Sequence, residues 1–167
     1  MIQENGFRGL GTLKKLKMAD NNFSKVPSGS FKQIASLEEL DLGRNPLTVL
    51  HSGDFSELSK LSVSDLTGCG RLILVEDNVF QNCVDLQRVT MSLNRQLTFI
   101  PGAAFDAMPR LRFLNLADNA LETFNPDEFQ VNWDHLSGLD LSGNPWRCDC
   151  DLIPLLHIVR DLALIHI

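Results

Sequence analysis

The chain has 167 residues, of which 44% are hydrophobic and 22% charged, and its formal net charge is −6. These values are typical of a folded domain with a sizeable core. The acidic charge excludes nucleic acid as the expected partner, because a phosphate backbone binds a basic surface. No apolar run reaches the roughly 18 residues of a membrane-spanning helix, so no membrane span is expected in this segment.

A hexapeptide pattern, with Leu first and mostly apolar residues fourth and sixth, recurs along the chain. Its six copies begin at Leu13, Leu37, Leu61, Leu86, Leu111 and Leu136. Alternating apolar residues predict a short strand with one buried side. Because a repeat of 24 or 25 residues cannot bury its own apolar face, the strands are expected to stack in parallel, one per repeat. Ser64 takes the fourth position of the third copy, where we expect it to weaken the local core.

Two further positions recur in this register. Eight residues after each start lie Asn21, Asn45, Cys69, Asn94, Asn119 and Asn144. A buried Asn side chain can satisfy the backbone groups of the turn after a strand, so stacked Asn residues predict a hydrogen-bonded ladder. A Phe precedes each start, at Phe7, Phe31, Phe55, Phe80, Phe105 and Phe129. It is expected to fill the space between the turns on the outer side.

Together these features resemble the leucine-rich repeat family over essentially the whole chain. Segments such as "VPSGSF" and "IPGAAF" look like the 24-residue repeat type that is common in extracellular members. The resemblance implies an α/β fold. This would be a right-handed leucine-rich repeat solenoid with parallel β-strands on the concave face and irregular or short helical turns on the convex face.

The same register predicts the organisation of the chain. Residues 1–12 match the second half of an upstream repeat, residues 13–143 form the leucine-rich repeats, and residues 144–167 begin a C-terminal cap. The first residues lack the apolar stretch of a signal peptide, and Met1 lies in the middle of a repeat. We therefore expect the chain to be a fragment, or the product of an incomplete gene model.

The segment "NPWRCDCDL", residues 144–152, resembles the start of the cysteine-rich flank that closes extracellular leucine-rich repeat proteins. In that flank two early cysteines pair with two later ones, after a short helix. Cys148 and Cys150 match the early pair, but no cysteine follows them. The resemblance therefore implies an incomplete disulfide cap with a truncated helix. It also implies an extracellular or cell-surface parent protein, secreted or membrane-anchored, because disulfides need an oxidising compartment.

The remaining cysteines leave two readings open. Cys69 takes a ladder position and Cys83 a buried Leu position, so both are explained as small buried apolar residues, although a disulfide between them is an alternative. For Cys148 and Cys150, a zinc site formed together with His157 is a weaker alternative to the disulfide cap, because zinc needs four well-spaced ligands. We expect free thiols at Cys69 and Cys83, and no metal or cofactor.

A glycosylation sequon agrees with an extracellular setting. Asn22, Phe23 and Ser24 form the tripeptide in the turn just beyond the ladder residue Asn21. Asn22 is therefore a candidate glycosylation site, although such tripeptides also occur by chance.

Equal repeat positions lie side by side in a parallel stack, so the sequence maps the concave face. In the first two repeats this places Lys14 beside Glu38, Lys15 beside Glu39, Lys17 beside Asp41 and Asp20 beside Arg44. Neighbouring opposite charges support the register of a sheet only weakly. The alternative is an ionic strip that docks a partner.

The middle repeats carry different residues on this face. Val63, Arg88 and Phe113 share the third position, Leu93 takes an eighth position, and Arg112 stands beside Phe113. Aromatic residues and Arg are over-represented at binding hot spots. These residues are candidates for ligand binding. The alternative is that the apolar ones among them are scattered surface residues without a binding role, which are common in folded proteins.

An acidic set is a further, weaker candidate for the binding surface. Asp41, Asp65 and Asp140 share the fifth position, with Thr90 and Asn115 between them. Such a column would favour a basic patch on a partner.

No group of residues in the sequence has the arrangement of a catalytic site, so an enzyme is not expected. We expect a non-catalytic protein-binding module of an extracellular or cell-surface protein, which recognises a protein ligand or receptor through its concave face. The alternative is a structural or matrix spacer, or an adhesion repeat, without a specific ligand site in this segment. A pre-formed sheet suits recognition because it loses little conformational entropy on binding.

Overall fold

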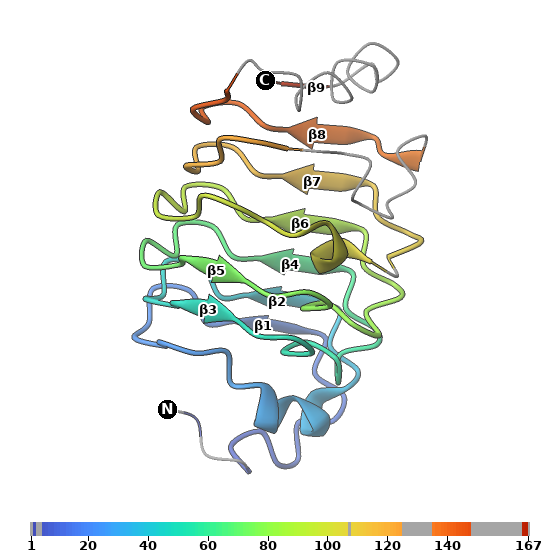
Figure 1. Cartoon of the computed structure of the whole chain (residues 1–167). Helices are drawn as coiled ribbons and strands as arrows, with labels where there is room; N and C mark the ends of the chain where they lie inside the picture. Colours follow the sequence, from blue (N-terminus) through green and yellow to red (C-terminus); the bar gives the residue numbers. More distant parts are fainter. Residues whose placement is uncertain (1, 3–4, 107, 125–134, 148–164, 167) are drawn as a thin grey trace.

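The computed structural model describes residues 2, 5–106, 108–124, 135–147 and 165–166 (Figure 1). One parallel sheet of seven strands runs through this part of the chain, in the order β1, β2, β4, β6, β7, β8, β9. Its strands are β1 (Lys15–Lys17), β2 (Glu39–Asp41), β4 (Val63–Asp65), β6 (Arg88–Thr90), β7 (Phe113–Asn115), β8 (Gly138–Asp140) and β9 (Ile165–His166). The first six coincide with the hexapeptide copies, which confirms one parallel strand per repeat.

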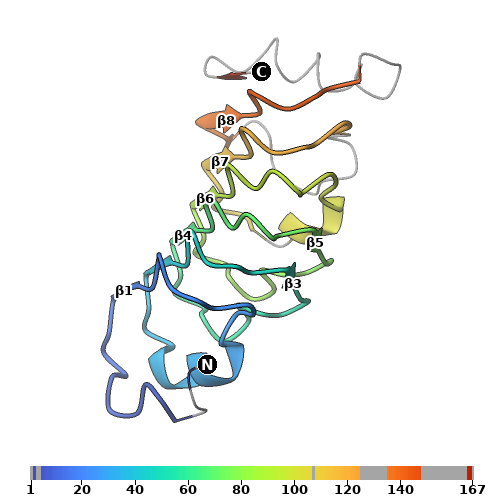
Figure 2. The same cartoon turned by 90° about the vertical axis from the view of Figure 1, so that its left-hand side faces the viewer.

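The opposite side of the molecule carries two-residue strands and 3₁₀-helices (Figure 2). Strands β3 (Val49–Leu50) and β5 (Leu74–Val75) pair in parallel as a second, two-stranded sheet. The 3₁₀-helices η1 (Ser28–Ile34) and η2 (Gly102–Phe105) follow Pro27 and Pro101. The chain is thus a solenoid whose long sheet faces one way and whose irregular or short helical turns face the other, as predicted.

A continuous apolar core lies between the two sides and extends from Phe7 to Leu141. The recurrent phenylalanines form a stack within it: ring centroids are 6.3 Å apart for Phe31 and Phe55, 4.9 Å for Phe55 and Phe80, and 6.3 Å for Phe80 and Phe105. All four rings are fully buried. Phe129 lies outside the described residues. The stack explains why Phe recurs, because each ring packs on the ring of the next repeat.

The Asn side chains at the ladder position donate hydrogen bonds to backbone carbonyls. The Nδ2 atom of Asn119 donates to the carbonyl of Leu116 in its own repeat and to that of Met91 in the preceding one, at 2.8 and 3.0 Å. The same two kinds of contact are made by Asn45, Asn94 and Asn144, whereas Asn21 donates within its own repeat. At the Cys69 position the thiol replaces the amide, and its Sγ lies 3.6 Å from the carbonyl oxygen of Leu42.

The cysteine predictions are resolved only in part. Cys69 and Cys83 are free thiols and fully buried. Burial raises the pKa of the Cys69 thiol to about 11 and that of Cys83 to about 12, so both stay protonated at neutral pH. Cys148, Cys150, His157 and the predicted cap helix lie outside the described residues.

The first six strands of the long sheet end in the same turn, in which the eighth residue of the repeat has a positive φ. This holds for Asp20, Arg44, Gly68, Leu93, Asp118 and Gly143, with φ between 53° and 71°. The backbone N–H of this residue donates to a carbonyl one repeat further on, as Leu93 does to Ala117 at 3.0 Å. The turn therefore continues the hydrogen-bonded ladder of the sheet beyond the strand.

Candidate functional site

The solvent-facing surface of the seven-stranded sheet carries the residues that the sequence singles out. Its register places Lys15, Glu39, Val63, Arg88, Phe113 and Gly138 side by side along one line. This confirms that equal repeat positions are neighbours on the concave face. The position of each side chain in a column is therefore known from its repeat, and the side-chain contacts decide what each column can do.

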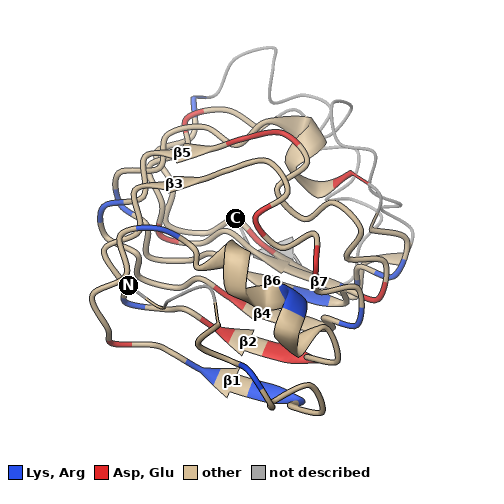
Figure 3. Cartoon of the chain, turned by 90° about the horizontal axis from the view of Figure 1, so that it is seen from below, with Lys and Arg blue, Asp and Glu red and all other residues tan. Residues whose placement is uncertain are grey.

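Three of the four charged columns of the first two repeats form ion pairs within the protein, and Lys17 and Asp41 do not pair. Distances of 2.7 Å join Lys14 to Glu38, Lys15 to Glu39 and Arg44 to Asp20. Arg44 holds both carboxylate oxygens of Asp20, which lowers the pKa of that carboxyl, and the hydrogen bond to Glu39 raises the pKa of Lys15. Figure 3 shows the basic strand β1 beside the acidic strand β2. These contacts support the register interpretation of the charges.

The fifth-position carboxylates, including the candidates Asp41 and Asp65, have an internal role. Asp41 accepts a hydrogen bond from the backbone N–H of Gly43 at 3.0 Å, and Asp65 accepts one from Thr67 at 2.9 Å. The Oδ1 atoms of Asn115 and Asp140 accept the corresponding bonds from Ala117 and Ser142. Each side chain thus caps the turn after its own strand, which explains the preference for Asp or Asn at this position.

Arg88 and Phe113 form the most distinctive contact on the sheet. The guanidinium carbon of Arg88 lies 4.1 Å from the centroid of the Phe113 ring, within the range of a cation–π interaction. Phe113 is half-buried rather than fully exposed. Its ring lies against Gly138, where a Cβ atom would come within 2.7 Å of the ring. Sequence reasoning missed Gly138, although it is the only glycine among the six third-position residues.

Arg112 and Leu93 take no part in the contact between Arg88 and Phe113. Arg112 donates a hydrogen bond from its Nη1 atom to the carbonyl of His135 at 3.1 Å. Leu93 is 43% exposed in the turn after β6, with a φ of 61° that leucine seldom adopts. Because all six eighth-position residues share this conformation, the φ follows from the turn. The exposed leucine side chain is the unusual feature.

A shallow hollow in the same face brings three other candidates together. Its volume is about 220 Å³, and Asp41, Val63 and Asp65 line it together with residues of β1 and β2. The structure therefore divides the predicted residues into this hollow over β1, β2 and β4 and the Arg88–Phe113 pair over β6 and β7.

The structure describes Asn22 as exposed. It borders a separate cavity of about 430 Å³ at the end of the solenoid where Ile2 lies.

Across the part of the chain that the structure describes, no group of three or more His, Cys, Asp or Glu side chains could hold a metal ion. Within those described residues, no helix is long and apolar enough to cross a bilayer.

Comparison with known proteins assigns the repeats to a family. The sequence matches the family described as leucine rich repeat over residues 11–70, 65–121 and 84–145. The chain belongs to the leucine-rich repeat family. Repeats of this family commonly mediate protein binding and are generally non-catalytic, in agreement with the expected class of function.

Three relatives illustrate the range of proteins to which this leucine-rich repeat chain is similar. The phospholipase A2 inhibitor of Gloydius brevicaudus siniticus is 46% identical over 68 residues, which are 41% of this chain and 20% of that protein. Leucine-rich repeat-containing protein 3 of Danio rerio is 31% identical over 101 residues, covering 46% of this chain and 38% of that protein. Platelet glycoprotein IX of Homo sapiens is 41% identical over 59 residues, which cover 35% of this chain and 33% of that protein. The chain thus spans well under half of each of these relatives.

Proposed function

We propose that the chain is the protein-binding part of an extracellular or cell-surface leucine-rich repeat protein, and that it recognises its ligand through the concave face. The observation that carries this proposal is the Arg88–Phe113 pair. Its ring lies outside the core, on a sheet whose inward side chains already form a continuous apolar cluster. Stacking of an aromatic ring with a guanidinium is a typical hot-spot arrangement.

The pair also has the pre-organisation that favours tight binding. Arg88 lies on one side of the Phe113 ring and Gly138 leaves room for the ring on the other. A ligand therefore meets a side chain already held in position and loses less conformational entropy on binding. Val63 extends the same column toward the hollow, so a ligand spanning both would contact β1, β2, β4, β6 and β7.

The test is to truncate the pair and measure binding. The chain is first screened against an array of secreted proteins and receptor ectodomains, and the affinity for each hit is then measured for Arg88→Ala and Phe113→Ala. We expect each change to weaken binding roughly tenfold or more, because a hot-spot side chain is lost. The melting temperature should change little, since neither side chain belongs to the buried core.

Val84→Ala is the matched control, because Val84 is an exposed apolar residue outside the sheet. A spacer would give no specific hit in the array, or hits whose affinity is the same for all variants. Affinity that survives both truncations undiminished would show that the Arg88–Phe113 pair is not the binding site.

The extracellular setting is supported by three observations. Asn22 is exposed, as glycosylation requires. Cys148 and Cys150 match the start of a disulfide cap, and one relative is named as a glycoprotein.

Glycosylation of Asn22 tests this setting. When the chain is secreted from animal cells behind an added signal peptide, we expect it to carry a glycan that peptide N-glycosidase removes. Asn22→Gln should abolish that mass difference, and a chain secreted without any glycan would contradict the assignment of Asn22.

A further inference from the structure

The two-stranded sheet on the other side of the solenoid carries a column of outward apolar side chains. Val49 and Leu74 are register partners in β3 and β5, and the residues after them, Leu50 and Val75, point into the core. Leu74 is 45% exposed. Phe99 takes the same position in the next repeat, 25 residues after Leu74, and is 52% exposed. We call this surface, with Ile73 beside Leu74, the β3–β5 face.

The β3–β5 face concentrates apolar surface that folding leaves in water. In the part of the chain that the structure describes, the large apolar residues with strongly exposed side chains are Leu10, Ile73, Leu74, Val84, Leu93 and Phe99. Half of this set lies on the one face. Isolated exposed apolar residues are ordinary, but neighbouring ones mark an interaction surface.

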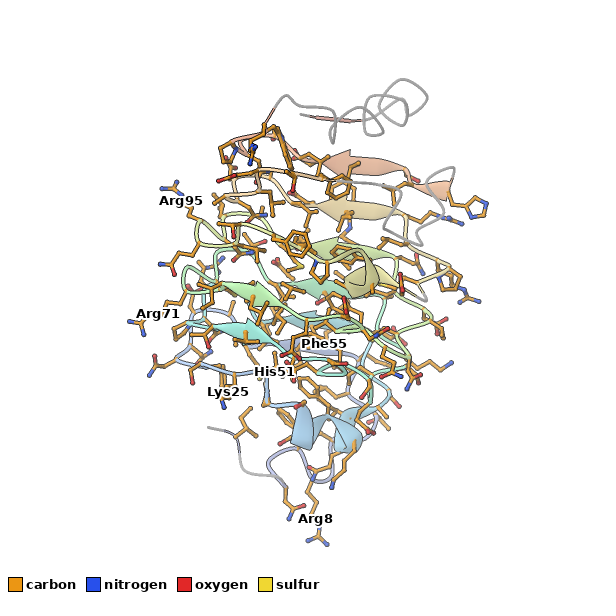
Figure 4. The ribbon with its side chains drawn as sticks, in the orientation of Figure 1. Arg8, Lys25, His51, Phe55, Arg71 and Arg95 are labelled. Carbon is orange, nitrogen blue, oxygen red and sulfur yellow. The ribbon has the colours of Figure 1, made fainter. Side chains whose placement is uncertain are left out.

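Three cations accompany this column. Lys25 takes the position of Val49 one repeat earlier, Arg71 lies two residues before Ile73, and Arg95 lies four residues before Phe99. All three point outward along one edge of the molecule (Figure 4). None of them forms an ion pair within the residues that the structure describes, whereas Arg44, Arg110, Lys14 and Lys15 do.

Two acidic groups near the column are already engaged. Glu76 follows β5, and its carboxylate accepts a hydrogen bond from the backbone N–H of Ser52 at 2.9 Å and lies 3.1 Å from the His51 ring. These contacts lower the pKa of Glu76. Glu122, at the repeat position of Ile73, pairs with Arg147 at 3.9 Å. Asp77, which follows Glu76, is exposed and forms no ion pair among the described residues, so three unpaired cations accompany one unpaired carboxylate. The net unpaired charge beside the column is therefore positive, although the chain as a whole is acidic.

We propose that the β3–β5 face is a second docking surface, which binds an acidic protein segment that also carries apolar side chains. Such a segment places carboxylates against Lys25, Arg71 and Arg95 and buries its apolar residues on Leu74 and Phe99. Charge complementarity selects this partner over a basic or neutral one. A polyanionic glycan would leave the apolar column in water, so a protein segment matches both features of the face.

The experiment selects peptides from a random display library on the immobilised chain. The β3–β5 face should enrich peptides that combine Asp or Glu with Leu, Ile, Phe or Trp. Synthetic copies of these peptides are then measured against Leu74→Thr/Phe99→Thr and against Arg71→Glu/Arg95→Glu. We expect roughly tenfold or greater loss of affinity in both double variants, because one removes apolar contacts and the other reverses the charge.

Val84→Thr and Arg8→Glu are matched controls away from the face, and both should retain affinity. The Arg88→Ala/Phe113→Ala variant should also retain affinity, so failure of the concave-face proposal and failure of this one are distinguishable. Threonine suits a strand, and thermal unfolding checks that each variant is folded.

Three results would overturn the proposal. The first is a selection that enriches no peptides, or only peptides without net negative charge. The second is peptide binding that both double variants leave unchanged. The third is the absence of peptide binding together with binding of phosphatidylserine vesicles that the same variants abolish, which would assign the face to a membrane.

Discussion

The eighth residue of each repeat shows how one backbone angle governs the choice of side chain. Asp20 and Asp118 tolerate a left-handed conformation because short polar side chains adopt it at low cost, and Gly68 adopts it freely. Arg44 and Leu93 are neither glycine nor short polar residues, so the left-handed conformation costs them more free energy. Arg44 gains a bidentate ion pair with Asp20, whereas Leu93 presents an exposed apolar side chain beside the candidate binding surface.

Gly68 and Gly70 provide a matched test of this conformational requirement. Gly68 has a φ of +71°, and an added Cβ would lie 3.2 Å from Cγ of Arg44, whereas Gly70 has open space around it. We expect Gly68→Ala to lower the free energy of unfolding by about 1–2 kcal/mol, the cost of a left-handed alanine. Gly70→Ala should be neutral or slightly stabilising. Urea denaturation measures both, and equal effects at the two sites would refute the explanation.

At the scale of the strand, the fifth-position side chain caps the turn after four of the repeat strands. Asp41, Asp65, Asn115 and Asp140 bind the backbone N–H two residues further on. Thr90 departs from this pattern, because its hydroxyl lies 3.5 Å from the carbonyl of Ser64. A column that looks like an acidic binding surface in the sequence is therefore first a set of turn caps.

Asp65 separates the two roles of this column. Asp65→Ala removes the acceptor for the N–H of Thr67 and should lower the free energy of unfolding by about 1 kcal/mol. Asp65→Asn should preserve stability, because Asn115 makes the same bond in its own repeat. Chemical denaturation of both variants, with Thr90→Ala as a milder control, tests this. If Asn and Ala are equally destabilising, the carboxylate charge rather than the hydrogen bond matters.

At the scale of the whole molecule, the solenoid carries two outward surfaces separated by one core. Arg88 and Phe113 lie on the concave sheet, and Leu74 and Phe99 lie on the β3–β5 face. The two sheets lie on opposite sides of the solenoid (Figure 2). Because the core between them is a single packed cluster, changes on the two surfaces share no contacts and their effects on stability should add. If both proposals hold, the two surfaces would bind two partners independently.

The repeat arithmetic alone determined the architecture and the register. Starts 24 or 25 residues apart place equal positions beside one another, because a solenoid can bury its apolar residues only if neighbouring repeats align. The ladder positions, the phenylalanine stack and the charge columns of β1 and β2 all follow from that alignment. They were predictable since each depends on the residue type at a repeated position.

The tertiary structure decided how individual side chains use those positions. Nothing in the repeat pattern shows that Arg88 covers Phe113, that Gly138 leaves room for the ring, or that Asp65 turns back to cap its own strand. The repeat pattern also does not show that Leu74 and Phe99 remain exposed to solvent on the β3–β5 face. Those outcomes depend on side-chain torsions and on the exact shape of the neighbouring repeat, which act between residues close in space and remote in sequence.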